Sequence, residues 1–469
     1  MIVTRRNLLL AGGGLAALGG LGIGTLALNA GDPPEAELPP VPAGRVRWSN
    51  WSGLQTCTPD AIAVPADANE LAQLLRTAKG VVRPVGAGHS FGALVPTDGT
   101  IVSLDRLNAL VAHDAQAMTA TVGAGVRLFN LGETLDGIGQ AMNALPDINK
   151  QSLAGAISTA THGAGANLGS LSSAVAALQL ITADGTLIDC DRTKNAELFN
   201  AARVSVGALG IVTQVKLQNR GPLRLKRKTW FEPIEDAIAA APERARTLRH
   251  FEFYYVTFTG TAYCISHEET DEPVTPRKAN AENEGTEELM SLRDWFSWAP
   301  WLRRMIGKGL ISNTETENVV GPAWRLLSTD RPKRFNEMEY HLPREALATV
   351  LPEVIATIER HNEVYFPIEV RFVAEDDAWL SPFYKRPSLS IAVHMGHTQN
   401  HDFFFSEIEP IYRKVEGRPH WGKLHSMKAA DLTALYPHFR DFTQTRAEKD
   451  PGGRFLNPYL KALFVDGLA

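Results

Sequence analysis

Cysteine, excess charge of one sign and low-complexity sequence are all scarce in this chain. Its 469 residues include 3 widely spaced cysteines, which excludes a disulfide framework and a CxxC metal pair but leaves room for one disulfide in an exported protein. The 47 Lys and Arg residues against 52 Asp and Glu residues give a net charge of −5, so no overall basic field attracts nucleic acid. The 39 Gly and 28 Pro residues are too few for a collagen-like or disordered chain.

The first 30 residues are predicted to be an export signal. Arg5 and Arg6 precede an uncharged apolar run from Leu8 to Ala30, and this combination resembles a twin-arginine signal. The run is also long enough to span a bilayer, so a permanent anchor is the alternative. Because the twin-arginine machinery carries folded proteins, often with a cofactor inserted, we expect an exported cofactor enzyme that is periplasmic or membrane-associated.

The rest of the chain predicts an α+β protein with two domains. Residues 31–44 are rich in Pro and acids and are predicted to be a linker. Residues 45–222 alternate short β-branched runs with Ala- and Leu-rich helices, whereas residues 223–415 contain longer strands that suggest an antiparallel sheet. We expect a solvated or mobile loop over residues 267–291, because many charges there accompany little apolar periodicity.

Short elements can be placed within the first domain. We predict a helix over residues 68–78 and strands over 81–85, 101–103 and 119–122. Residues 174–188 read as two strands joined by an Asp-Gly turn at Asp184 and Gly185.

Three glycine-bearing loops are candidates for ligand binding. RPVGAGHSFG (83–92) follows a buried strand, so its backbone amides can approach an anion. AGAISTATHGAG (154–165) has so few large side chains that we expect something else to lie against it. GALGIV (207–212) leads into a strand. Each loop alone is compatible with an ordinary glycine turn, and the specific signal is their combination.

Together these loops resemble the flavoproteins of the vanillyl-alcohol oxidase superfamily, and within it the aldonolactone oxidase and alditol oxidase family. In the second half, FNEMEYHLP, PIEVRF, DDAWLSP and RPHWGKLHS resemble the substrate-domain motifs of that family. The resemblance implies a two-lobed FAD-binding domain of the vanillyl-alcohol oxidase (PCMH) type over residues 45–222. It further implies a substrate (cap) domain over 223–415 and a C-terminal segment, 416–469, that returns to the flavin site.

The resemblance also implies which residues hold FAD. The pyrophosphate is expected on Gly86 to Ser90, and the flavin ring between the domains. In family members with a histidine at the position of His89, that ring is bonded covalently to the flavin; the alternative is a turn histidine hydrogen-bonded to backbone. His162 is expected to shape its loop. The implied cofactor-binding residues are Gly86, Ala87, Gly88, His89, Ser90, Phe91, Gly155, Ser158, Thr159, Thr161, His162, Gly163, Gly210, Ile211 and Val212.

Four residues are candidates for catalysis. On a strand, Glu369 and Arg371 lie on one face, and spacing alone is equally compatible with a surface ion pair. The resemblance implies that both contact substrate hydroxyls and the flavin, and that Lys423 lies near the flavin ring, where a cation stabilises negative charge. His394 is either a pocket residue or a core histidine. His394 and His397 lack further ligands at zinc-site spacing, so we expect no metal.

The implied reaction is oxidation of an alcohol on a sugar-acid lactone, of the D-arabinono-, L-gulono- or L-galactono-1,4-lactone type, by hydride transfer to FAD. An alditol (polyol) oxidase is the enzyme alternative, and an exported sugar-binding flavoprotein without turnover is the alternative from another class. Typical oxidases of the family have a small residue where this chain has Pro146. A rigid proline there favours a cytochrome or quinone over dioxygen as electron acceptor.

Overall fold

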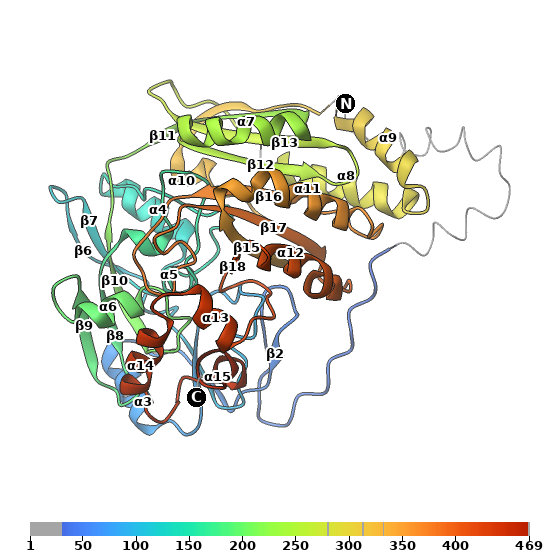
Figure 1. Ribbon diagram of the computed structural model, residues 1–469. Helices are drawn as coiled ribbons and strands as arrows, with labels where there is room; N and C mark the ends of the chain where they lie inside the picture. Colours follow the sequence, from blue (N-terminus) through green and yellow to red (C-terminus); the bar gives the residue numbers. More distant parts are fainter. Residues whose placement is uncertain (1–30, 279–280, 312–313, 332, 468–469) are drawn as a thin grey trace.

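The chain folds into two lobes, each built on its own β-sheets (Figure 1). The computed structural model describes residues 31–278, 281–311, 314–331 and 333–467. The predicted export signal, residues 1–30, lies outside the described residues, whereas the predicted linker, 31–44, contains no helix or strand. No helix in the described part of the chain is both long and apolar enough to cross a membrane. The three cysteines are free.

A small parallel sheet opens the first lobe. Helix α3 (Ala68–Thr77) begins where the Asp67 side chain accepts hydrogen bonds from the backbone N–H groups of Asn69 and Glu70, and it buries Leu71 and Leu75. The predicted helix over 68–78 is therefore confirmed. The sheet has the order β3-β5-β4, and a two-stranded sheet precedes it. The strands are β1 (Trp48–Ser49), β2 (Thr56–Cys57), β3 (Ala61–Ala63), β4 (Val82–Val85) and β5 (Thr100–Ser103).

A five-stranded antiparallel sheet, in the order β6-β7-β10-β8-β9, completes this lobe. The predicted hairpin is confirmed: β8 and β9 pair antiparallel, and Gly185 takes the positive φ of 78° that the turn requires. The strands are β6 (Leu110–Asp114), β7 (Thr119–Gly123), β8 (Val175–Ile181), β9 (Leu187–Asp191) and β10 (Ile211–Gln218). The helices are α4 (Leu128–Gly137), α5 (Leu153–Ser158), the 3-10 turn η1 (Leu171–Ala174) and α6 (Ala196–Ala202).

The second lobe is an eight-stranded antiparallel sheet in the order β14-β11-β13-β12-β16-β17-β15-β18. Seven of its strands lie within residues 223–415, where an antiparallel sheet is expected, and β18 lies in the C-terminal segment. Helix α7 packs on β11, β12 and β13, and α11 lies beside it (Figure 1). Strands β15 and β17 are buried on both faces and lie in the interior of the lobe. The strands are β11 (Arg224–Pro233), β12 (His250–Val256), β13 (Thr261–Glu269), β14 (Asn318–Pro322), β15 (Phe335–Pro343), β16 (Ile368–Val373), β17 (Ser388–Gly396) and β18 (Arg418–Pro419).

The expected loop over residues 267–291 is wrong at both ends. Strand β13 continues to Glu269, and helix α8 begins at Ala281. Helix α8 packs against α9 and buries Leu292 in its last turns. Its large apolar residues all come after residue 288, so the sequence before that point shows no amphipathic helical pattern. The helices of this lobe are α7 (Ile234–Thr247), α8 (Ala281–Phe296), α9 (Pro300–Ile311), α10 (Ala323–Leu326), the 3-10 turn η2 (Arg344–Ala346), α11 (Leu347–Ile358), the π-helix η3 (Phe404–Ile408) and α12 (Glu409–Arg413).

The C-terminal segment joins both lobes. Strand β18 pairs with β15, and the chain then passes through α13 (Ala429–Leu435), α14 (Phe439–Lys449) and α15 (Pro458–Phe464) beside the first lobe (Figure 1). The buried guanidinium of Arg83 donates to the backbone oxygens of Leu94, Gly207 and Phe455. Residues from β4, from the third glycine loop and from the C-terminal segment are thereby held by one side chain.

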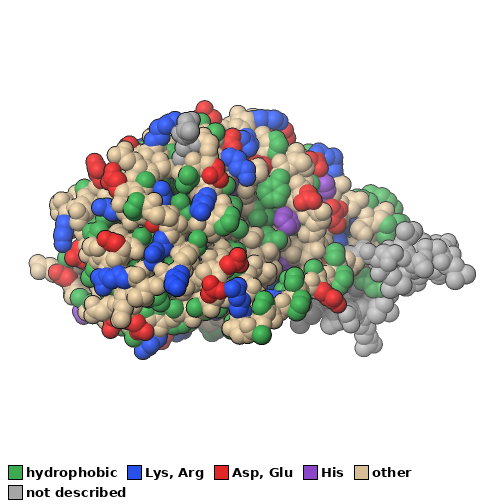
Figure 2. All heavy atoms as spheres, turned by 90° about the horizontal axis from the view of Figure 1, so that it is seen from below, with side chains coloured by type: hydrophobic (Ala, Val, Ile, Leu, Met, Phe, Trp, Pro, Cys, Tyr) green, Lys and Arg blue, Asp and Glu red, His purple; other side chains and the backbone are tan. Residues whose placement is uncertain are grey.

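Basic and acidic side chains are interspersed on the face of the molecule drawn in Figure 2.

Candidate active site

A cavity of about 2010 Å³ is lined by residues of both lobes. The first lobe contributes the three glycine-bearing loops, the second contributes strands β12, β15, β16 and β17, and the C-terminal segment contributes His420, Gly422 and Lys423. Pockets for small molecules usually have about 300–1,000 Å³. The cavity is therefore large enough for a dinucleotide cofactor together with a substrate.

Most of the predicted cofactor residues reach this cavity. Two do not. Phe91 is buried with its ring against Trp51 and Phe335, so it supports the loop from behind. Gly163 borders a smaller cavity beside His250. Those that line the large cavity are Gly86, Ala87, Gly88, His89, Ser90, Gly155, Ser158, Thr159, Thr161, His162, Gly210, Ile211 and Val212.

The glycines allow the three loops to pack directly on neighbouring protein atoms. A Cβ at Gly86 would lie 2.0 Å from Oγ of Ser152, and one at Gly163 would lie 2.3 Å from the backbone oxygen of Leu145. These two glycines are thus required by the packing of the protein itself. At Gly155 the nearest atom to an added Cβ is Oγ of Ser152 at 3.1 Å, and the residue borders the cavity. The wall built in this way is backbone and small side chains, which fits a large planar cofactor with a diphosphate.

His89 lies in the wall as a neutral imidazole. Its ring stacks on Trp51 with 5.3 Å between centroids. Burial, reinforced by the positive charges of Lys423, Arg127 and Lys150, lowers the pKa of His89 to about 4. Within the described ranges no group hydrogen-bonds to the ring, so the expected alternative of a turn histidine held by backbone is not what the structure shows. A neutral ring nitrogen at physiological pH is available as a nucleophile.

Arg371 and Glu369 project from β16, and their side chains are buried in direct contact with each other. Strand β12 places Glu252 directly opposite Arg371 and Tyr254 opposite Glu369. Nε of Arg371 donates to Oε2 of Glu252 at 2.7 Å, and Nη2 donates to the Tyr254 hydroxyl at 3.2 Å. Nη2 also lies 3.7 Å from Oδ2 of Asp147, which comes from the first lobe. A surface ion pair is therefore excluded.

Lys423 and His394 complete the polar wall. Strand pairing places Glu337 of β15 opposite His394 of β17, and the ammonium of Lys423 is bonded to Glu337. Nδ1 of His394 is 3.2 Å from the backbone oxygen of Pro367, an acceptor, so this nitrogen carries the proton. Its Nε2 lies 3.6 Å from Glu337 and 3.8 Å from Glu369. The four predicted catalytic residues are thus brought together.

Carboxyl groups and cations are crowded together in this wall. Asp147, Glu252, Glu337 and Glu369 face Arg331, Arg371 and Lys423, and Arg227 adds positive charge near Asp147. Burial raises the pKa of Glu369 to about 8, against the attraction of Arg371 and with help from the neighbouring carboxylates. Glu369 therefore holds a proton at neutral pH.

Burial and neighbouring charges also set the protonation of Asp147 and His394. Burial would raise the pKa of Asp147, but Arg331 and Arg371 hold it below its ordinary value. Burial lowers the pKa of His394 and outweighs the nearby carboxylate of Glu337, so its imidazole is neutral at pH 7.

The residues that sequence reasoning missed are mostly the partners of those it found. Glu252 and Tyr254 are polar residues within an otherwise apolar strand, and that interruption was the available signal. Glu337 and Glu339 lie in the quoted motif FNEMEYHLP without having been singled out. Asp147 and Arg331 had no signal, because their meeting depends on contact between loops far apart in the sequence.

His162 joins the two lobes, which extends the predicted role of shaping its loop. Its Nε2 is 2.8 Å from Oε1 of Glu339 on β15, and its Nδ1 is 2.9 Å from the backbone oxygen of Gly163. The rings of His341 and His420 pack around it at centroid distances of 5.1 and 5.9 Å. Although burial opposes it, this group of imidazoles holds the pKa of Glu339 well below its ordinary value.

Pro146 borders the cavity, at the position that the family resemblance implies. Its backbone oxygen accepts a hydrogen bond of 2.6 Å from Oγ of Ser328. The next residue, Asp147, is bonded to Thr329 and Arg331. The segment is therefore fixed by the second lobe.

The comparisons with known proteins agree with this geometry. A family model described as D-arabinono-1,4-lactone oxidase matches residues 215–463. The chain belongs to the D-arabinono-1,4-lactone oxidase family. A second model, described as an FAD binding domain, matches residues 59–191. The family membership makes this chain an FAD-dependent oxidoreductase of the sugar-lactone type, as predicted.

Individual relatives cover almost the whole chain. The L-gulono-1,4-lactone dehydrogenase of Mycobacterium tuberculosis is 35% identical over 426 residues, which are 88% of this chain and 98% of that protein. The L-gulonolactone oxidase of Bos taurus is 28% identical, over 89% and 98% of the two chains. The alditol oxidase of a Streptomyces species is 31% identical, over 89% and 99%.

A solved structure shows the fold. Cholesterol oxidase from Brevibacterium sterolicum superposes with a TM-score of 0.71 at 16% identity, over 92% of this chain and 100% of that one. The two-lobed flavoprotein fold predicted from the sequence is confirmed, and this likeness carries no statement about substrate.

Glu252 can be tested as the residue that positions Arg371. A Glu252→Gln variant should lower kcat/KM by about 10- to 100-fold, because a buried guanidinium loses one charged partner. The apparent pKa of Glu369 should fall as well, since one of the carboxylates that raise it is gone. Activity against pH and FAD content per chain are the measurements.

Glu232→Gln is the matched control. Glu232 lies on β11 and pairs with Arg244, outside the cavity lining. An unshifted pH profile in Glu252→Gln, or an equal shift in Glu232→Gln, would contradict the role given to Glu252.

Proposed function

We propose that this protein oxidises an alcohol of a sugar-acid 1,4-lactone, of the D-arabinono, L-gulono or L-galactono type, by hydride transfer to FAD. The observation that carries the proposal is the buried guanidinium of Arg371, paired with Glu252 and in contact with Glu369, beside Lys423 on one wall of the shared cavity. A guanidinium and a protonated carboxyl can donate hydrogen bonds to ring and hydroxyl oxygens of a polar substrate. Relatives named as lactone dehydrogenases and oxidases support this substrate class.

The protein residues bind, orient and manage charge and protons. FAD, when bound, supplies the hydride acceptor. Gly86 to Ser90 would hold its pyrophosphate. Arg371 and Glu369 would orient the substrate hydroxyls, and Lys423 provides positive charge where negative charge develops. Phe91 lies under Lys423 with 5.2 Å from Nζ to the ring centroid, which fixes the direction of the ammonium.

His394 is proposed to take the alcohol proton. Glu369 already holds a proton below about pH 8, so it is a poor acceptor at neutral pH. Nε2 of His394 is unprotonated because Nδ1 carries the proton. The imidazolium formed by proton transfer would lie near Glu337, which stabilises its charge.

A His394→Asn variant should slow flavin reduction about 100-fold or more at pH 7, because general-base catalysis contributes about 10²–10⁴. In the parent, the rate should fall as the pH drops through the lowered pKa of His394, since the protonated ring cannot accept another proton. Anaerobic stopped-flow reduction measures both effects. His397→Asn, a change outside the cavity lining, is the control. A rate unchanged in His394→Asn rules out this role.

We also propose that His89 is bonded covalently to the flavin. Its place in the cavity wall and its neutral ring support this. After acid precipitation the yellow colour should stay with the parent protein and pass to the supernatant in His89→Ala. Colour released from the parent would reduce His89 to a loop residue.

A cytochrome or quinone is proposed as the electron acceptor. The supporting feature is Pro146, which is fixed at the cavity wall and has no amide hydrogen. Reduced protein should be reoxidised faster by a quinone analogue than by air. Pro146→Gly should raise the rate with air, and no gain would remove the argument.

Export through the twin-arginine machinery, to the periplasm or its membrane face, is proposed from Arg5 and Arg6 and the apolar run after them. Lysine at both positions should keep the protein inside the cell.

An alditol oxidase is the second candidate, favoured by the Streptomyces relative. Anaerobic bleaching of the flavin separates the two candidates, with 1,4-lactones and open-chain polyols as the panel. We expect bleaching by at least one lactone at lower concentration than by any polyol. The reverse order would establish the alditol oxidase, and bleaching by neither class would overturn the proposal.

A further inference from the structure

Helices α8 and α9 expose an unusual set of apolar side chains. Trp295, Trp298 and Trp301 are 50%, 47% and 70% exposed, and Met305 is 59% exposed. None of the other six tryptophans is among the exposed large apolar residues. Trp301 and Met305 are one helical turn apart on α9, and the indole N–H of Trp298 donates to the backbone oxygen of Trp295. The four side chains define what we call the tryptophan face.

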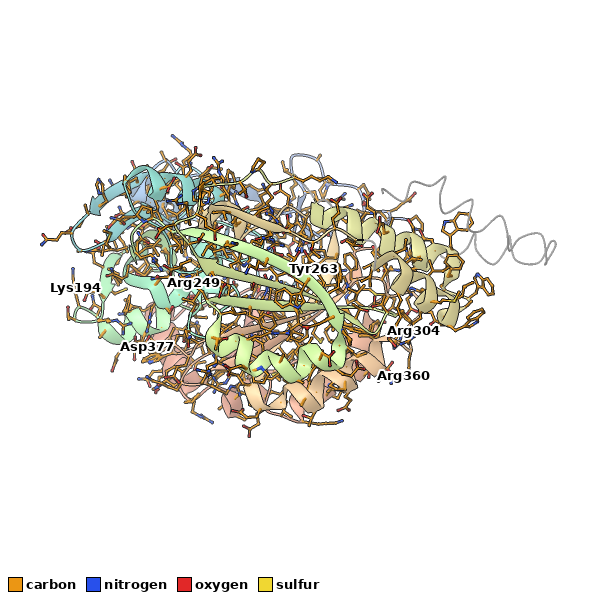
Figure 3. All side chains as sticks on the ribbon, turned by 90° about the horizontal axis from the view of Figure 1, so that it is seen from above. Lys194, Arg249, Tyr263, Arg304, Arg360 and Asp377 are labelled. Atoms are coloured by element: carbon orange, nitrogen blue, oxygen red, sulfur yellow. The ribbon has the colours of Figure 1, made fainter. Side chains whose placement is uncertain are left out.

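The charged residues of the segment that carries the tryptophan face are basic. The acidic side chains Asp294 and Asp32 lie beside this segment, and both are ion-paired with the buried Arg293. Between Trp295 and Thr314 the sequence has no Asp or Glu but has three basic residues. Arg303 is buried, whereas Arg304 and Lys308 are exposed. Arg304 is bonded to Glu359 at 2.6 Å, so Lys308 supplies the positive charge that is least compensated. In Figure 3, Arg304 lies at the α9 end of the molecule, far from Lys194 of the first lobe.

The described chain begins against α8. Oδ1 of Asp32 is 2.8 Å from Nη1 of the buried Arg293 on that helix. The described part of the chain therefore starts against the helix that also carries Trp295.

We propose that the tryptophan face docks on the surface of a lipid bilayer with anionic headgroups. Tryptophan side chains favour the interface between water and hydrocarbon, and Lys and Arg beside them are attracted to acidic lipids. Lys308 and Arg304 would meet the headgroup phosphates while the indoles enter the interface.

Docking here has a consequence for the cavity. Leu289 and Trp295 of α8 and Leu310 of α9 line its wall, so the docked helices would form the side of the cavity that faces the bilayer. The proposal deepens the localisation given above and does not depend on the substrate, so a failure of one leaves the other unaffected.

The test uses the purified full chain and vesicles of phosphatidylcholine and phosphatidylglycerol with brominated acyl chains. Bromine quenches tryptophan that enters the interface, and residues 1–30 contain no tryptophan, so the signal reports on the folded body. We expect quenching in the parent. Trp298→Ser together with Trp301→Ser should remove most of it and weaken binding by about tenfold or more, and Lys308→Glu should weaken binding to anionic vesicles above all.

The matched control carries Val111→Ser and Leu187→Ser, two exposed apolar residues of the first lobe. It should bind as the parent does, and thermal unfolding midpoints check that every variant is folded. Parent fluorescence that is not quenched would overturn the proposal. Quenching in the double tryptophan variant as strong as in the parent would overturn it too. A parent dimer that is lost in this variant would also overturn it, because the face would then be a contact between protein chains.

Discussion

The buried guanidinium of Arg371 is the constraint on which the site depends. A cation held in a closed protein interior needs carboxylates and hydrogen-bond acceptors around it, because desolvation otherwise costs several kcal/mol. Here Glu252, Glu369 and Asp147 provide them. Two of these come from adjacent strands of the second lobe and one from the first lobe. Satisfying one charge therefore fixes how the lobes meet.

The same requirement sets the protonation of the site. The carboxylates that stabilise Arg371 also repel one another, and Lys423 and Arg331 compensate only part of that repulsion. Burial, with help from these carboxylates, keeps a proton on Glu369 at neutral pH, and burial leaves the neighbouring His394 as the neutral base. Glu369 and His394, two neighbouring residues of the wall, thus acquire different roles from their surroundings. The first lobe contributes a wall of backbone and small side chains that suits the cofactor.

The sequence predicted those parts of the molecule that local patterns determine. Period-two alternation placed Glu369 and Arg371 on one face, and an Asp-Gly pair located the hairpin turn at Gly185. The family resemblance identified most of the cavity-lining loop residues. The local sequence does not determine whether a loop residue faces the cavity or the protein behind it. Phe91 and Gly163 were therefore predicted to bind the cofactor, although their neighbours are other protein groups. Helix α8 was missed because its apolar contacts are concentrated in its last turns.

Contacts between distant segments could not be predicted from one sequence. Asp147 meets Arg371 across 224 positions of the chain, and no spacing rule connects them. The opposite pairing of Glu252 and Arg371 requires the order of strands in the sheet, which depends on how the whole lobe packs.

The charge balance around Arg371 is tested most directly by infrared spectroscopy of the protonated carboxyl group. Spectra of the parent and of Glu369→Gln would be compared between pH 6 and pH 10. The account predicts a protonated-carboxyl C=O band in the parent at pH 7 that disappears as the pH rises through about 8, with no such band in the variant. A parent spectrum that lacks the band at pH 7, or retains an identical band in Glu369→Gln, would contradict it.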